Sequence, residues 1–582
     1  MKVSQLRQYV YKMSSQKINP FRHEYFIGYI NQVFPQFVRV HFPSSVLLNG
    51  FTHFGKEFNG GLVGNFVVIE SEKYGFLGRI TELSLPESER LSLNEKAFQT
   101  SDFHPTGKIE ILLSFDLYDP FTVKKGLIAY PNIGAKVFVS SGELVQEYMS
   151  RFGVKTGEKI QSIDVGNLVS NPDTKVKVNI QSIFGRHCAV VGTTGGGKSY
   201  TVSKLIESLI VTGNKTILID ATGEYIGNYD KVKSIDIGDG KNIFHYSQLT
   251  VDDMFFLLKP SPRTQTPKLM EAIRSLKMVK IEGDVTQLEH NGETIPIDNG
   301  LLKKNGKPKK PYDVFYYRNI SAVENGMADF DFSKLARQIS EECIFDNGTA
   351  WGNVATTDVS YCVSLISRVT NLANTPELNQ IFGFQQEKTS NDLTDVINQF
   401  ISAENTTDNL LRLNLENVKY DFQVRETLVN AIGKFLLAKA RNGQFKNSPV
   451  VVFIDEAHQF LNKSIKDEYF DSKPLDAFDS IAKECRKHGL FLCIATQMPR
   501  DIPHGTLSQM GTFIVHRLIN HNDKEAISNA CSSANKNTLE FLPILGEGEA
   551  VLTGVDFPMP IIMKFDLPQN EPNSKTPNLN IL

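Results

Sequence analysis

The sequence predicts an α/β protein with three parts: a small N-terminal β-barrel or sandwich, an α/β core, and a mainly helical lobe inserted into that core. Short, partly alternating apolar segments separated by Gly, Pro and Asn fill the first part. Continuous apolar runs between helical patterns fill the core, and a long amphipathic stretch interrupts them. A chain of 582 residues is also too long for a single hydrophobic core.

We place the domain boundaries where this pattern of apolar and polar residues changes. The expected parts are, in chain order, a β domain over residues 1–150, the first part of the core over 151–250, the inserted lobe over 251–405, the second part of the core over 406–566, and an extended, Pro- and Asn-rich tail over 567–582.

Short strands are expected between residues 26 and 140, for example over residues 37–42, 64–70 and 108–114. Close spacing and turn residues between such strands are typical of a small barrel or sandwich. Residues arranged for catalysis are not evident in this part of the sequence.

The core is predicted from runs that are apolar throughout rather than alternating. They occupy residues 216–220, 449–455, 490–496 and 512–516. Runs of this kind fit strands of a sheet that is covered on both faces, and their alternation with helical patterns fits right-handed βαβ units.

The inserted lobe contains amphipathic helical patterns at residues 335–344 and 361–369. It also contains a Gly- and Pro-rich loop that carries Lys303, Lys304, Lys307, Lys309 and Lys310. A cluster of lysines is usually a solvated loop, and phosphate contact is the alternative.

The most specific motif is residues 192–199, which read Gly-Thr-Thr-Gly-Gly-Gly-Lys-Ser between an apolar run and a helical pattern. This is the phosphate-binding pattern G-x-x-x-x-G-K-[ST] in the expected strand–loop–helix context. Backbone N–H groups of such a loop surround the β-phosphate, and the helix dipole adds to the attraction. The predicted nucleotide-binding residues are Gly192, Thr193, Thr194, Gly195, Gly196, Gly197, Lys198, Ser199 and Tyr200.

Within this loop Lys198 is expected to contact the β- and γ-phosphates, and the hydroxyl of Ser199 is expected to bind Mg²⁺. A second motif supplies the carboxylates. Asp455 and Glu456 end the apolar run 449–455 and begin the sequence Asp-Glu-Ala-His. Asp455 is predicted to hold Mg²⁺ through water, and Glu456 to act as the general base on the attacking water.

Three further polar residues end apolar runs of the core. Gln497 follows the run 490–496 and is predicted to contact the γ-phosphate or the water. Asp220 and Glu224 follow the run after the phosphate-binding helix, where ligands of parallel sheets bind, although a structural turn is the alternative for Glu224.

Phosphoryl transfer also needs positive charge near the transferred group, often an arginine from a neighbouring subunit. The candidates are Arg486, Arg500 and Arg517, of which Arg486 is favoured and Arg517 is the second choice.

Composition excludes several classes of protein. The net charge of −3 is not the positive overall charge that indicates nucleic-acid binding, so any DNA-binding surface must be local. The six cysteines show no C-x-x-C pair and are expected to be reduced and buried. Neither a membrane span nor a signal peptide is recognised, and a cytoplasmic location is expected.

Together these motifs resemble the HerA family of hexameric ATPases, in the superfamily that includes the FtsK DNA translocases. The resemblance rests on an ordered set of segments, which are residues 192–199, 219–225 (Ile-Asp-Ala-Thr-Gly-Glu-Tyr), 455–458, 484–489 and 495–500. Ala221 stands where proline is common in that family, and Cys485 stands where glycine is common.

The resemblance implies a RecA-like P-loop NTPase core, a HAS-barrel-like N-terminal domain, and ATP with Mg²⁺ at subunit interfaces. It also implies a homo-hexameric ring with double-stranded DNA in its pore and a partner nuclease or sirtuin-like effector on the barrel face. Bacterial relatives of this size often occur in antiviral gene pairs.

Three functions follow. The first is a DNA-translocating motor ATPase, and the second is a regulatory ATPase scaffold that assembles and activates an effector with little translocation. The third, a P-loop kinase or small-molecule transferase, is disfavoured because adjacent Asp455 and Glu456 suit the activation of water.

Overall fold

The computed structural model describes residues 20–53, 55–86, 103–117, 123–125, 129–151, 162–227, 229, 231–388, 392–402, 407–419, 423–461, 466–467, 470–471, 475–531 and 536–574. The chain forms two compact units. Unit 1 comprises residues 1–212 and 493–572, and unit 2 comprises residues 213–492 and 573–582.

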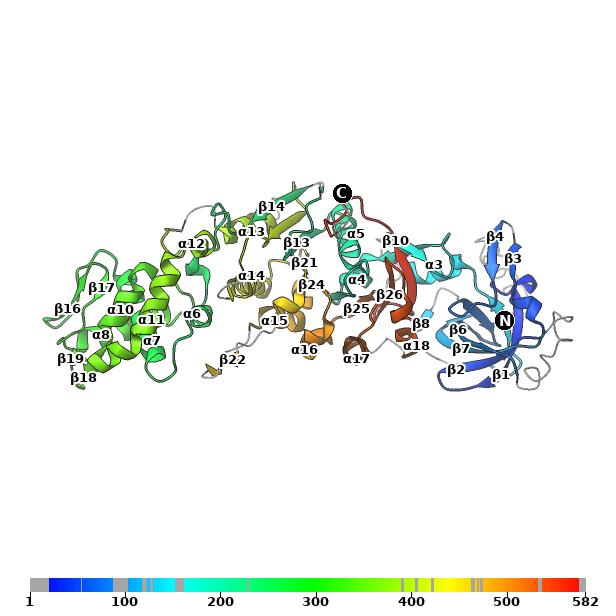
Figure 1. Ribbon diagram of the computed structural model, residues 1–582, viewed down its shortest axis with the longest axis horizontal. Helices are drawn as coiled ribbons and strands as arrows, with labels where there is room; N and C mark the ends of the chain where they lie inside the picture. Colours follow the sequence, from blue (N-terminus) through cyan, green and yellow to red (C-terminus); the bar gives the residue numbers. More distant parts are fainter. Residues whose placement is uncertain are drawn as a thin grey trace, which may run out of the picture. The chain divides into compact units, whose positions relative to one another are not determined.

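The N-terminal part of unit 1 is a closed antiparallel barrel of six strands, drawn in blue in Figure 1. The strand order is β2-β1-β9-β5-β6-β7, and β7 pairs with β2 to close the barrel. The sequence left barrel and sandwich open, and the pairing of β2 with both β1 and β7 decides for the barrel. Its interior is filled by buried aliphatic and aromatic side chains, among them Ile27, Val40, Ile69 and Phe76.

The elements of this part are β1 (Phe26–Val33), β2 (Phe37–His41), β3 (Gly50–His53), β4 (Lys56–Asn59), β5 (Phe66–Glu70), β6 (Tyr74–Ser84), β7 (Thr106–Asp116), β8 (Val123–Lys125), β9 (Lys136–Val139) and the helix α3 (Gly142–Arg151).

A buried arginine of the barrel wall contacts the C-terminal part of unit 1. Arg79 of β6 lies 3.0 Å from the carboxylate of Glu110 on β7, and both side chains are buried. The same guanidinium donates a 2.7 Å hydrogen bond to the hydroxyl of Thr538. The ion pair therefore joins two barrel strands, and the hydrogen bond to Thr538 connects them to the C-terminal part of unit 1.

The rest of unit 1 is a mixed sheet with the strand order β11-β10-β27-β26-β25-β12-β24. β12 has parallel partners on both sides, namely β24 and β25. The strands from β25 to β11 pair antiparallel. The sequence predicted βαβ units throughout, and the hairpin of β26 and β27 instead extends the sheet without a crossover helix.

The elements of this part are β10 (Ser162–Leu168), β11 (Lys175–Asn179), α4 (Ile180–Phe184), β12 (Cys188–Val191), α5 (Lys198–Val211), β24 (Leu490–Thr496), α16 (His504–Leu507), β25 (Thr512–Val515), α17 (His521–Ala530), α18 (Lys536–Leu539), β26 (Glu549–Gly554) and β27 (Ile561–Phe565).

Unit 2 holds four parallel strands in the order β21-β13-β20-β14. Nearly all residues of β13, β20 and β21 are buried, as expected for strands covered on both faces. The elements of this part are β13 (Lys215–Asp220), β14 (Val232–Asp236), β20 (Leu410–Asn414), α14 (Val424–Arg441), β21 (Val450–Ile454), β22 (Lys466–Asp467), β23 (Phe470–Asp471) and α15 (Ala477–Glu484).

The inserted lobe belongs to unit 2 and is mainly helical, as predicted, with two small antiparallel sheets in addition. Its elements are α6 (Val251–Leu258), α7 (Gln265–Glu282), β15 (Gln287–His290), β16 (Glu293–Asp298), β17 (Leu301–Leu302), α8 (Lys310–Arg318), α9 (Ile320–Val323), α10 (Leu335–Glu341), β18 (Ile344–Asp346), β19 (Trp351–Val354), α11 (Thr356–Asn374), α12 (Pro376–Phe382) and α13 (Leu393–Ile401).

The lysine cluster of the lobe is largely engaged in contacts inside the lobe. Lys304 is 1% exposed and lies 2.7 Å from the Glu342 carboxylate, with the ring of Tyr312 at 4.3 Å. Lys303 pairs with Glu341, and Lys309 pairs with Asp346. The expectation of an open, solvated loop is therefore wrong for Lys304, which is part of the lobe's core and cannot reach a phosphate.

The described part of the C-terminal tail runs back along the helix α5. The backbone N–H of Asn570 donates to the Glu207 carboxylate at 2.6 Å, and its carbonyl accepts from the Ser203 hydroxyl at 2.6 Å. Residues 575–582, the end of the predicted extended tail, lie outside the described residues.

Two expectations from composition can be compared with the structure. All six cysteines are buried, as predicted. Among the helices in the described part of the chain, none is both long and apolar enough to cross a membrane.

Candidate functional site

The glycine-rich segment forms a loop between a buried strand and a helix, the context that the sequence predicted. β12 is completely buried, and α5 begins at Lys198. Gly195 and Gly197 have φ angles of +73° and +101°, which side chains other than hydrogen rarely allow. Gly192 is required for a different reason, because a Cβ atom there would lie 2.6 Å from the Cβ of His516.

The neighbours of the loop bring two predicted site residues to it. The Thr194 hydroxyl donates a 2.5 Å hydrogen bond to the side-chain oxygen of Gln497. The backbone N–H and the hydroxyl of Thr193 both donate to the carbonyl of Arg517, each at 3.1 Å. Gln497 and Arg517 therefore lie beside the loop of their own chain.

The loop is built to receive a phosphate group. Lys198 is 5% exposed, so its ammonium is largely removed from bulk water. The first residues of α5 leave backbone N–H groups without intrahelical acceptors, and these groups attract anions. Gly195 and Gly197 adopt positive φ angles without strain, which allows the backbone to curve and turn its N–H groups toward an anion.

In unit 2 the predicted acidic pair follows β21. Asp455 and Glu456 are 1% and 6% exposed, and the backbone N–H of Asp455 donates to the carbonyl of Ile219. Glu456 has left-handed backbone angles, with φ +46° and ψ +45°. Such a conformation in a residue other than glycine costs about 1–3 kcal/mol and is frequent at active sites.

The carboxylate of Glu456 also has a specific neighbour. The Nδ1 atom of His458 lies 3.3 Å from Glu456 Oε2. No role was predicted for His458 beyond its place in the Asp-Glu-Ala-His segment. The contact places an imidazole beside the carboxylate that was predicted to be the general base.

Asp220 is held by contacts within unit 2. Its carboxylate lies 2.6 Å from the guanidinium of Arg412 on β20, and both side chains are buried. It also accepts hydrogen bonds from the backbone N–H groups of Gly223 and Tyr225, at 2.9 and 3.2 Å. These bonds shape the segment from Asp220 to Tyr225. Arg412 was missed from the sequence, although an arginine inside an apolar strand is a signal for a buried acid.

Two other buried groups border this segment. Arg425 of α14 donates to the carbonyls of Ala221 and Leu415. Tyr225 is 1% exposed, and burial, together with the charges of Asp455, Asp220 and Glu224, raises the pKa of its hydroxyl well above the usual range. Its phenol therefore stays protonated beside the carboxylates.

The arginine candidates lie in different surroundings. Arg486 is exposed and lies in a short segment that ends at Gly489. The carbonyl of Gly489 accepts a hydrogen bond from the N–H of Val450, which places this segment near the start of β21. Asp455 follows the other end of β21, and a strand of five residues is about 16 Å long. Arg500 is paired with Asp523 at 3.3 Å. Arg486 thus lies at the opposite edge from the acidic pair, which suits contact with another subunit.

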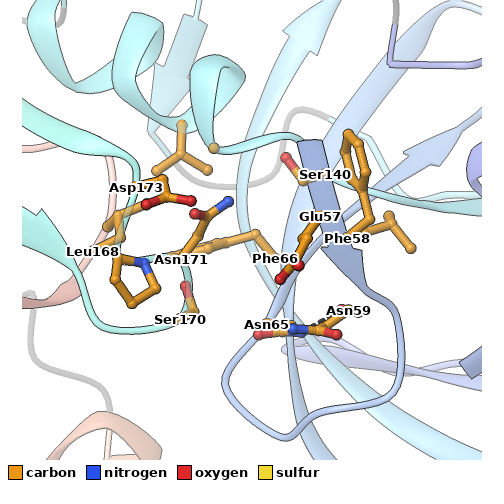
Figure 2. Close-up of a pocket in the computed structure, with 14 residues that line it drawn as sticks. Glu57, Phe58, Asn59, Asn65, Phe66, Ser140, Leu168, Ser170, Asn171 and Asp173 are labelled. Carbon is orange, nitrogen blue, oxygen red and sulfur yellow. Dashed lines mark hydrogen bonds between the residues drawn. The ribbon is translucent and has the colours of Figure 1, made fainter. Parts of the chain in front are cut away.

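A separate polar pocket of about 100 Å³ lies in unit 1, between the hairpin of β4 and the turn after β10. Figure 2 shows Glu57, Asn59 and Asn65 on one side and Asn171 and Asp173 on the other. Because its two carboxylates would repel a phosphate, this pocket is not a second nucleotide site.

Comparison with known proteins gives two family matches. The family described as "Helicase HerA, central domain" matches residues 163–368, and "Helicase HerA-like C-terminal" matches residues 438–574. The first match contains the glycine-rich loop and the segment from Asp220 to Tyr225, and the second contains Asp455, Glu456 and Gln497. Together the two matches cover more than half of the chain.

Similar proteins extend over nearly the whole chain. The DNA double-strand break repair helicase HerA of Saccharolobus solfataricus is 23% identical over 518 residues, which are 87% of this chain and 88% of that protein. The protein of the same name from Sulfurisphaera tokodaii is 23% identical over 89% of this chain and 90% of its own.

Among solved structures, the bacterial conjugative coupling protein TrwB matches with a TM-score of 0.42 and 11% identity, over 75% of this chain and 95% of its own. The two family matches, on the residues that build the loop and the acidic pair, identify the chain as a member of the HerA helicase family and as a P-loop ATPase.

Proposed function

We propose that this chain is a ring-forming ATPase that couples ATP hydrolysis to movement along double-stranded DNA. The observation that carries the proposal is the family's ordered set of motifs, with the phosphate-binding loop formed and the acidic pair buried at a strained strand end. The chain hydrolyses ATP with Mg²⁺ as cofactor. The relatives' names include repair of DNA double-strand breaks, which supports a DNA substrate here.

The chemistry follows from the residues of the two motifs. The N–H groups of the loop and Lys198 bind and orient the phosphates. Ser199 and Asp455 offer the hydroxyl and carboxylate oxygens that suit Mg²⁺, which neutralises charge on the phosphates when bound. Glu456, which lies 3.3 Å from His458, accepts the proton of the attacking water. Gln497, tied to Thr194, orients that water or the γ-phosphate.

The positive charge for the transition state comes from two arginines in this proposal. Arg517 acts in its own subunit, because Thr193 of the loop binds its carbonyl. Arg486 acts on the neighbouring subunit of a six-membered ring, because it is exposed and follows α15 at the edge opposite the acidic pair. An effector protein on the barrel would then be activated or driven by the ring.

The proposal is tested by measuring ATP hydrolysis by the purified chain with and without linear duplex DNA, alongside its native mass. We expect a hexamer whose ATPase rate rises with DNA and whose DNA affinity falls steeply with salt, since phosphate contacts release counterions. A DNA-independent ring that is active only with a partner protein would instead support the regulatory scaffold.

We predict that Arg486→Ala forms rings and binds ATP but hydrolyses it at least 10³-fold more slowly, the usual contribution of an arginine finger. Mixing it with Lys198→Ala subunits restores part of the activity, because each variant supplies what the other lacks. The matched control is Lys487→Ala, which removes the adjacent exposed cation. If mixed rings stay inactive, the role of the arginine that acts across the subunit boundary passes to a residue other than Arg486.

A further inference from the structure

A buried histidine lies directly against the phosphate-binding loop. His516 follows β25, is 0% exposed, and donates its backbone N–H to the carbonyl of Val191 at 2.7 Å. Its Cβ approaches Gly192 so closely that no other residue fits there. The imidazole therefore occupies the space beneath the loop, and the motifs discussed above give it no function.

Both ring nitrogens of His516 have hydrogen-bond partners. Nδ1 lies 2.9 Å from the carbonyl oxygen of Glu549, and Nε2 lies 3.0 Å from the hydroxyl of Thr201 on α5. Because a carbonyl only accepts, the proton belongs on Nδ1, and Nε2 accepts from the Thr201 hydroxyl.

Burial lowers the pKa of His516 to about 4, and the positive charge of Lys198 acts in the same direction. The imidazole is thus neutral at physiological pH. A neutral ring adds no positive charge beside Lys198 and retains the lone pair that binds Thr201.

The carbonyl that holds Nδ1 belongs to a turn that forms the second wall of the loop. In this turn Gly548 donates its N–H to the carbonyl of Gly196 at 3.3 Å. Its Cα would lie 2.9 Å from a Cβ at Gly197. The carboxylate of Glu549 accepts from the N–H of Gly546 at 2.8 Å, which closes the turn. His516 therefore connects the start of α5, the loop and this turn.

We infer that His516 is a positioning residue for the phosphate-binding loop: its imidazole links Thr201 to Glu549 and holds the loop's N–H groups and Lys198 in place before nucleotide binds. The inference deepens the ATP site and rests on the chain's ATP binding. A loop ordered in advance loses less conformational freedom on binding, which strengthens affinity. Since the loop contacts phosphates before and during the reaction, the expected effect is on binding rather than on turnover.

Two variants break the same hydrogen bond from opposite sides. Thr201→Val removes the hydroxyl and keeps the shape, whereas His516→Asn keeps a donor for Glu549 and removes the acceptor for Thr201. Each is expected to raise the dissociation constant for ATP roughly three- to tenfold, the effect of one lost hydrogen bond, with kcat unchanged. The double variant is expected to be no weaker than the worse single variant.

The matched control is Thr512→Val. Thr512 lies at the other end of β25 and is buried, and its hydroxyl donates a 2.9 Å hydrogen bond to the carbonyl of Ser182. This variant is expected to lower the melting temperature without changing ATP affinity.

The measurements are nucleotide titration, steady-state kinetics and thermal unfolding without nucleotide, with the unmodified chain in parallel. Unchanged ATP affinity in folded Thr201→Val would overturn the inference, as would an equal loss of affinity in Thr512→Val. If His516→Asn does not fold, Thr201→Val alone decides. Failure of the unmodified chain to bind ATP would count against the ATP site itself, not against the role of His516.

Discussion

Replacing Glu456 by glutamine is expected to slow ATP hydrolysis about 10²–10⁴-fold while leaving ATP bound, because this is the usual contribution of a positioned general base. The carboxylate is buried, lies 3.3 Å from His458, and stands on a strained backbone at the end of β21. Glutamine keeps the size and the hydrogen-bonding reach of the side chain but cannot accept the proton of the attacking water.

The measurement is single-turnover hydrolysis together with ATP retention on the purified protein. Glu377→Gln is the matched control, because it removes an exposed carboxylate of the same unit that pairs with the exposed Lys419. Such a pair contributes little, so this control should hydrolyse ATP normally. Near-normal turnover by Glu456→Gln would remove Glu456 from the role of base.

The parts of the fold that follow from local sequence were predictable. The glycine-rich loop, its helix and the acidic pair are each encoded within a dozen residues, and their strand–loop–helix context follows from apolar runs beside them. The closure of the barrel could not be predicted from local sequence, because it depends on β2 pairing with β7, about 70 residues further along the chain.

Contacts between distant residues were not predictable. The partner of Asp220 is Arg412, 192 positions away, and the carbonyl of Ala221 is bound by Arg425, 204 positions away. Lys304 looks like part of a charged loop in the sequence, yet Glu342 and the ring of Tyr312 enclose it. One sequence cannot reveal which acid or ring a buried cation meets after folding.

The same limit applies to the catalytic residues themselves. Sequence reasoning named Gln497 and Arg517, and the contacts with Thr194 and Thr193 bring both to the loop. It did not find His516, because its partners Thr201 and Glu549 are 315 and 33 positions away and carry no shared motif. The roles of the site residues remain predictions that the variants described here test.

Replacing Lys198 by alanine is expected to weaken ATP binding itself rather than turnover alone. Lys198 is 5% exposed at the start of α5, directly after the left-handed Gly197, the position from which the lysine of this motif reaches the phosphates. Removing one member of a buried charge pair costs about 2–4 kcal/mol, which is a factor of about 30–1,000 in affinity. Because Lys198 contacts the phosphates before and during the reaction, this loss appears in the dissociation constant.

The matched control is Lys204→Ala, which removes a partly exposed lysine from the same helix, beyond the first turn. Alanine favours the helix at both positions, so both variants should fold and melt like the unmodified chain. Nucleotide titration should then separate them, with weak binding in Lys198→Ala and normal binding in Lys204→Ala. Equal ATP affinity in the two variants would contradict the assignment of residues 192–199 as the phosphate-binding loop, because a loop that holds ATP without its lysine lacks the charge that this motif supplies.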